Sequence, residues 1–79
     1  MKIKIIGDVL HLDSGYSSEK ITPELFEDWQ TILHNDIGIL HRMLEGDGRP
    51  KDVKYKEEEI YNSEMILEMI KEKFPEYAV

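Results

Sequence analysis

Apolar and polar residues alternate on both sides of the Gly7-Asp8 dipeptide, and this pattern constrains the fold more than any other feature of the chain. Glycine at the first central position of a two-residue turn is typical of a type II′ β-hairpin. A hairpin with this turn places the apolar side chains of both strands on one face. An isolated hairpin is not stable in water, so we expect the rest of the chain to cover that face. The predicted register pairs Ile6 with Val9, Ile5 with Leu10, Lys4 with His11, Ile3 with Leu12 and Lys2 with Asp13.

A helix is predicted after a polar loop at residues 14–21. Thr22 suits the N-cap, Pro23 suits the first helical position and Gly46 suits the C-terminal cap. At about 100° per residue, the apolar residues of this segment fall within an arc of about 160°, which is typical of an amphipathic helix. These residues are Leu25, Phe26, Trp29, Ile32, Leu33, Ile37, Ile39, Leu40, Met43 and Leu44.

Asp36 lies in the middle of this apolar arc and supports two interpretations. In the one that we favour, the helix kinks near residues 35–38 and Asp36 caps a second segment, because Asp caps well and Gly38 weakens a helix interior. In the other, the helix is continuous and Asp36 is a half-buried carboxylate with a functional partner.

Residues 53–56 alternate and predict a third strand beside the hairpin, because Val53 and Tyr55 favour strands. The alternative is one long helix that continues to Phe74, which Lys56 and the three glutamates after it favour. We expect the strand.

A last helix is clearer, because Asn62 or Ser63 suits its N-cap and Pro75 follows its end. The chain is short enough to form one domain over residues 1–79. The predicted fold class is therefore α+β, in the order β-β-α-β-α. Two helices pack on one face of a three-stranded sheet in two layers.

The last helix carries an apolar arc of roughly 200°, which is wider than one small core can cover. Such an excess indicates a dimer interface or a groove for a partner. We expect a homodimer. The residues predicted at its interface are Met65, Met69, Ile70 and Phe74.

The chain is acidic, with 17 Asp and Glu residues against 10 Lys and Arg residues and a net charge of −7. A field of this sign favours basic partners and repels nucleic acid and anionic membranes. Glu64, Glu68 and Glu72 lie at i, i+4 and i+8, so they share one helix face at intervals of about 6 Å. The residues predicted to bind a partner are Glu24, Glu27, Asp28, Glu57, Glu58, Glu59, Glu64, Glu68 and Glu72.

These acids support three interpretations. The one that we adopt is a non-catalytic interaction protein that binds and modulates or inhibits another macromolecule by docking on a basic protein. The second is an imitation of DNA that occupies the nucleic-acid site of a DNA- or RNA-binding protein. The third is a solvated helix face that serves solubility alone. Small size, acidity and the absence of catalytic motifs are typical of small inhibitors made by phages and mobile elements.

The sequence contains no motif for catalysis, for a cofactor or for a metal, and we expect none of these functions. The alternative is a small metal-assisted enzyme that uses Asp36, His41 and Glu45, of which the last two lie one helical turn apart. There is no Cys and hence no disulfide. A signal peptide and an apolar run of about 20 residues are also absent, so we expect a cytoplasmic domain that does not enter a membrane.

Overall fold

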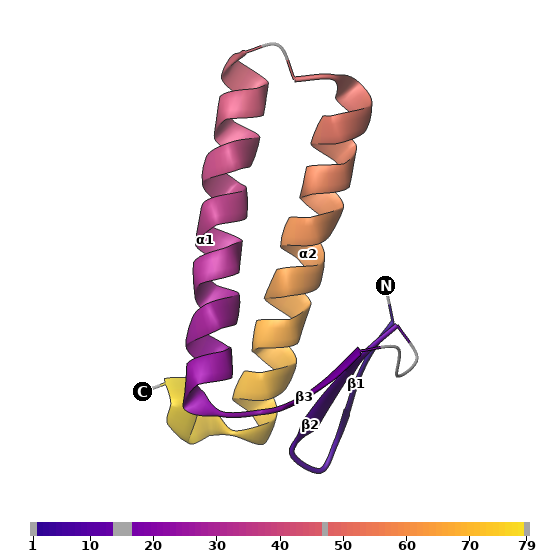
Figure 1. The fold of residues 1–79 in the computed structure, drawn as a ribbon. Helices are drawn as coiled ribbons and strands as arrows, with labels where there is room; N and C mark the ends of the chain where they lie inside the picture. The colour runs from indigo at the N-terminus through magenta and orange to yellow at the C-terminus, as the bar shows by residue number, and fades with distance from the viewer. Residues whose placement is uncertain (1, 14–16, 47, 79) are drawn as a thin grey trace.

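The computed structural model describes residues 2–13, 17–46 and 48–78. Three antiparallel strands come first: β1 (Ile3–Ile6), β2 (Val9–Leu12) and β3 (Ser17–Lys20), in the sheet order β1-β2-β3. Two long helices follow, α1 (Pro23–Glu45) and α2 (Pro50–Lys73), and then a short 3-10 helix, η1 (Pro75–Ala78). The helices lie side by side as a hairpin, and the sheet lies at the end where α1 begins and α2 finishes (Figure 1).

The N-terminal hairpin has the predicted turn and register. All four pairs between β1 and β2 match the prediction. The amide of Asp13 donates a hydrogen bond to the carbonyl of Lys2 over 2.7 Å, which extends the ladder to the fifth predicted pair. Gly7 has a φ of 62°, whereas Asp8 does not have a positive φ. This combination is the sign pattern of a type II′ turn.

The third strand is Ser17–Lys20 rather than residues 53–56, so the element order is β-β-β-α-α and this part of the prediction is wrong. β3 pairs with β2 in an antiparallel register that joins Leu12 to Ser17. All four side chains of β3 are exposed, so backbone hydrogen bonds hold the strand and its sequence shows no alternation. Of the loop predicted at residues 14–21, residues 14–16 lie outside the described residues.

α1 begins and ends as predicted. The hydroxyl of Thr22 accepts a hydrogen bond from the amide of Leu25 over 3.1 Å, and Pro23 occupies the first helical turn. At the other end, the amide of Gly46 donates to the carbonyl of Arg42 over 2.9 Å. Both caps satisfy backbone groups that a helix leaves without partners at its ends.

Both helices are continuous where breaks were expected. α1 runs for 23 residues without interruption, so the kink that we favoured near residues 35–38 is wrong. Asp36 lies inside the helix and has a cation opposite it rather than free amides to cap. α2 begins at Pro50, so the predicted start at Asn62 or Ser63 is also wrong. The Lys and Glu residues of this segment favour helix and outweigh the short alternation at residues 53–56.

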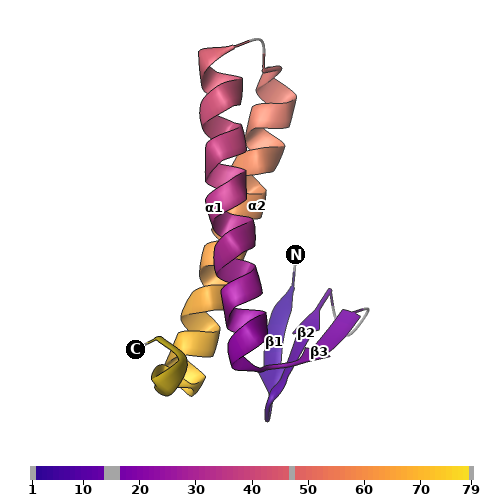
Figure 2. The same cartoon turned by 60° about the vertical axis from the view of Figure 1, so that its left-hand side comes forward.

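The core lies between one face of the sheet and the adjoining ends of both helices, which confirms the α+β class. Five apolar side chains are at most 5% exposed: Leu10, Ile21, Phe26, Ile66 and Ile70. Among the described apolar residues, none between 30 and 65 belongs to this core or packs against it, although the polar Ser63 is buried beside it on α2. The rest of the hairpin, residues 32–45 of α1 and 50–62 of α2, packs helix against helix beyond the sheet (Figure 2). We call this part the distal half.

Candidate functional site

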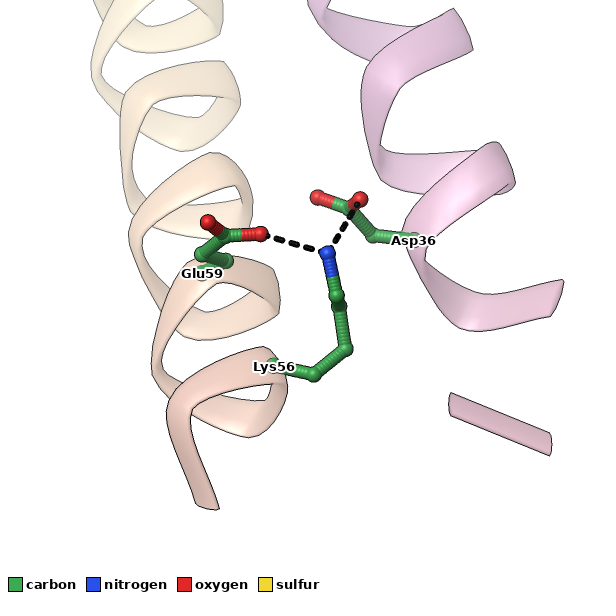
Figure 3. Close-up of polar contacts among 3 residues, drawn as sticks. All are labelled: Asp36, Lys56 and Glu59. Atoms are coloured by element: carbon green, nitrogen blue, oxygen red, sulfur yellow. Dashed lines mark hydrogen bonds and ion pairs between the residues drawn. The ribbon is translucent and has the colours of Figure 1, made fainter. Parts of the chain in front are cut away.

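A lysine is held between two carboxylates where α1 and α2 meet (Figure 3). The Nζ atom of Lys56 on α2 lies 2.7 Å from Oε2 of Glu59 and 3.3 Å from Oδ1 of Asp36 on α1. The side chains of Lys56 and Asp36 are 17% and 13% exposed, so this ion pair is largely buried. Asp36 is therefore a half-buried carboxylate in a continuous helix, as in the second interpretation of the sequence.

The environment of Lys56 keeps its side chain charged. The hydrogen bond to Glu59 raises the pKa of Lys56, and the hydrogen bond and charge of Asp36 act in the same direction against the opposing effect of burial. A protonated amine is neither a nucleophile nor a base. The cluster is therefore suited to fixing which residues of the two helices lie opposite each other.

A groove of about 560 Å³ opens beside this cluster. The residues that line it are Asp13, Trp29, Ile32, Asp36, Tyr55, Glu58, Glu59, Asn62 and Ser63. Four of them are carboxylates, and two of these, Glu58 and Glu59, belong to the set predicted to bind a partner. Carboxylates beside aromatic rings are chemically suited to cations rather than anions.

The outer surface of α2 carries a row of glutamates with a tyrosine among them. Glu57, Tyr61, Glu64, Glu68 and Glu72 follow one another at spacings of three and four residues, so they share one face of the helix. All five are exposed, and Tyr61 is 65% exposed. We call these five residues the acidic face. The ion pairs within the described chain are Lys20–Asp8, Lys56–Asp36 and Lys56–Glu59, and none of them neutralises the acidic face.

The remaining residues predicted to bind a partner lie elsewhere. Glu24, Glu27 and Asp28 are exposed near the start of α1. Glu58 and Glu59 line the groove, and Glu58 also borders the hollow beside Glu57 and Tyr61. The structure thus divides the predicted set among three places, and the acidic face contains the largest share of it.

The protein's own fold covers much of the apolar arc that predicted a dimer. Ile70 is fully buried in the core and offers no surface to a second copy. Met65, Met69 and Phe74 are half-buried. The ring of Phe74 stacks on Tyr77 of η1, with 5.2 Å between the ring centroids. The sheet and η1 therefore supply cover that the helix pattern alone did not reveal.

The residues of the alternative enzyme are not brought together. Asp36 faces Lys56 between the helices, whereas His41 and Glu45 are exposed. Within residues 2–13, 17–46 and 48–78, no three His, Cys, Asp or Glu side chains are grouped so that they could hold a metal ion.

Sequence reasoning missed several residues of these sites, among them Lys56 as the partner of Asp36, Asp13 in the groove, and Tyr61 on the acidic face. Lys56 had a detectable signal. Asp36 and Lys56 lie at similar distances on either side of the loop between the helices, so treating residues 50–73 as one helix would have placed them opposite each other.

Comparison with protein-family models, with curated proteins and with solved structures gives no match for this chain. In the part of the chain that the structure describes, neither helix has an apolar stretch of the length needed to cross a membrane. The function is therefore inferred from the site itself.

Proposed function

We propose that this chain is a non-catalytic interaction protein that docks its acidic face on a basic surface of another protein and thereby modulates it. One observation carries the proposal. Four carboxylates and a tyrosine are exposed on one helix face, and no cation of the described residues pairs with them. Like charges at i, i+4 cost a helix a few tenths of a kcal/mol per pair. Cations on a basic partner would attract these carboxylates and offset the repulsion between them.

Tyr61 gives the acidic face an apolar anchor. It is 65% exposed and lies between Glu57 and Glu64 along the helix. Tyrosine is enriched among the residues that dominate binding energy, whereas charges at an interface rim mainly steer association and fix orientation. We therefore assign anchoring to Tyr61 and steering to the glutamates around it.

The density of charge favours a basic protein surface over an imitation of DNA. Residues at i, i+4 present one charge for about every 6 Å of helix axis, whereas duplex DNA presents one for about every 1.7 Å. Lys54 also lines the hollow beside Glu57 and Tyr61 and dilutes the negative field there. The linear arrangement of the glutamates is the observation that keeps imitation of DNA as the second candidate.

The test is a triple charge reversal with a matched control. The test variant carries Glu64→Lys, Glu68→Lys and Glu72→Lys. The control carries Glu19→Lys, Glu45→Lys and Glu76→Lys, which are exposed positions on β3, at the end of α1 and in η1. Both variants change the net charge of −7 by the same amount, so a difference between them reports position rather than total charge.

We expect the wild type and the control to capture the same protein from cell extract, and the test variant to lose it while keeping its helical circular dichroism. Affinity for the purified partner should fall as salt rises, because exposed charges are screened beyond about 8–10 Å at physiological ionic strength. Binding that survives both high salt and the test variant contradicts the proposal. Equal loss in both variants shows that net charge alone matters. Competition by a DNA duplex for the partner supports the second candidate.

A further inference from the structure

The groove beside Asp36 has an order along its length that the antiparallel helices fix. Asp36 lies opposite Lys56. Trp29 comes seven residues before the former and Ser63 seven residues after the latter, so these two lie at a similar level of the helical hairpin. Seven residues span about 10 Å of helix axis. The groove therefore extends over about 10 Å, from Trp29 at the end near the sheet to Tyr55 at the end beside Lys56 (Figure 1).

Each end of the groove combines an aromatic ring with carboxylates. At the end near the sheet these are Trp29 and Asp13, the residue that follows β2. At the other end, Tyr55 shares a side of α2 with Glu58 and Glu59, which are three and four residues further along the helix. The lining is therefore acidic and aromatic at both ends rather than at a single point.

The groove stays negative after the neighbouring cation is counted. Lys56 contacts one oxygen of Asp36 and one oxygen of Glu59 (Figure 3). The four carboxylates of the lining carry −4 and the ammonium of Lys56 carries +1, so the net charge is −3. Neither Asp13 nor Glu58 takes part in an ion pair among the described residues. A concave site of this sign attracts cations.

A buried hydroxyl lines the groove at its end near the sheet. Ser63 is only 3% exposed, and the hydrogen bonds between described side chains do not include it. In the described part of the chain, no side-chain polar atom is both enclosed and without a partner, so the hydroxyl of Ser63 opens on the groove. A buried hydroxyl normally has a hydrogen-bond partner. At this position the partner comes from the contents of the groove, and an ammonium group supplies three donors.

We propose that the groove binds a linear organic dication, in which two amines are joined by an aliphatic chain, as in diamines and polyamines. One ammonium group lies between Asp13 and the ring of Trp29 and donates a hydrogen bond to Ser63. The other lies against Tyr55 and the glutamates beside it, and the aliphatic chain covers Ile32 between them. A metal ion would leave this apolar wall uncovered.

The size of the groove agrees with a ligand of this kind. Its volume of about 560 Å³ lies within the range of about 300–1,000 Å³ that is typical of small-molecule sites. None of the five residues of the acidic face lines the groove. The inference is therefore independent of the proposed function.

Titration of the wild type with amines of different length tests the proposal. Trp29 is the only tryptophan of the chain, so its fluorescence reports on the groove directly. An extended chain covers about 1.2 Å per bond, so 1,7-diaminoheptane separates its amines by about 10 Å and 1,3-diaminopropane by about 5 Å. 7-Amino-1-heptanol keeps the length of the first but has one charge.

At constant ionic strength, 1,7-diaminoheptane should bind about three- to fivefold more tightly than either of the other two, because only it places a cation at both ends. Equal affinity for the three amines overturns the proposal. A fluorescence change that does not saturate by about 10 mM overturns it as well.

Variants of the groove give a second test, with helical circular dichroism to confirm that they fold. Asp13→Asn/Glu58→Gln removes one charge near each end, and asparagine tolerates the φ of 52° at residue 13. It should weaken 1,7-diaminoheptane about three- to tenfold. The matched control, Asp52→Asn/Glu76→Gln, removes the same charge from exposed positions outside the groove and should bind like the wild type.

The aromatic contribution is tested separately. Tyr55→Leu keeps an apolar side chain but removes the ring, and it should weaken binding about two- to fivefold. Equal weakening by the test pair and its control would show that net charge alone attracts the amine, and this result overturns the proposal.

Discussion

At the scale of residues, Lys56 links α1 to α2 at a largely buried position. A charge without a partner is unfavourable in free energy at such a position. Its contact with Asp36 crosses between the helices, and its contact with Glu59 lies within α2. A buried pair contributes little net stability compared with apolar residues of the same volume, but loss of one partner leaves the other charge uncompensated. The pair therefore acts chiefly on specificity, because a shifted helix pairing would separate Asp36 from its cation.

The first prediction concerns this pair. Lys56→Met should lower the free energy of unfolding by about 1–3 kcal/mol, less than for a fully buried pair because water still reaches both side chains. Asp36→Leu/Lys56→Leu should recover most of that loss, because it removes both charges at once. Urea unfolding of the wild type and of these two variants measures both effects. A double variant that is less stable than Lys56→Met would show that the ion pair stabilises the fold outright.

The second prediction follows from the raised pKa of Lys56. A group with a higher pKa in the folded than in the unfolded state contributes stability that is complete below its ordinary pKa. That contribution is lost as pH rises through the pKa that the group has in the folded state. Above the ordinary value of 10.5, the stability advantage of the wild type over Lys56→Met should therefore shrink. Both proteins contain the same tyrosines, so their difference in urea midpoint isolates Lys56. A difference that stays constant contradicts the assignment.

At the scale of elements, two glycines should respond to alanine with opposite signs. Gly7 has a φ of 62° in the hairpin turn, so Gly7→Ala should lower the free energy of unfolding by about 1–2 kcal/mol. A Cβ added at Gly38 would meet no atom within 4 Å. Because alanine favours a helix interior more than glycine does, Gly38→Ala should raise the free energy of unfolding by about 0.5–1 kcal/mol. Thermal and urea unfolding check both values. A destabilising Gly38→Ala would contradict the continuous helix.

Elements set by local chemistry were predictable from sequence, and elements set by distant partners were not. The turn at Gly7 and the cap at Thr22 act within a few residues, and both were found. β3 is held by the backbone of β2 and has four exposed side chains, so its sequence resembles a loop. Residues 53–56 alternate over too short a stretch to distinguish a strand from a helix whose partner, α1, lies across a loop.

At the scale of the whole molecule, the candidate site divides in the same way. The exposed glutamates of α2 could be grouped from helical spacing alone. The contact between Asp36 and Lys56 joins residues 20 apart, so it became visible only once α2 was known to begin at Pro50. The groove was out of reach of sequence reasoning because Asp13 comes from the end of the hairpin and the rest of its lining from two helices.

The last prediction is that the two ends of the helical hairpin differ in local stability. The core residues Phe26, Ile66 and Ile70 lie where the sheet covers the helices, and the distal half has no such cover. Regions with fewer buried apolar contacts open with a smaller free energy than the whole molecule. Amide hydrogen exchange at low protein concentration should therefore be slowest around these three residues and faster in the distal half. Uniform protection along both helices would contradict this prediction, because it would show that the helical hairpin opens as one unit.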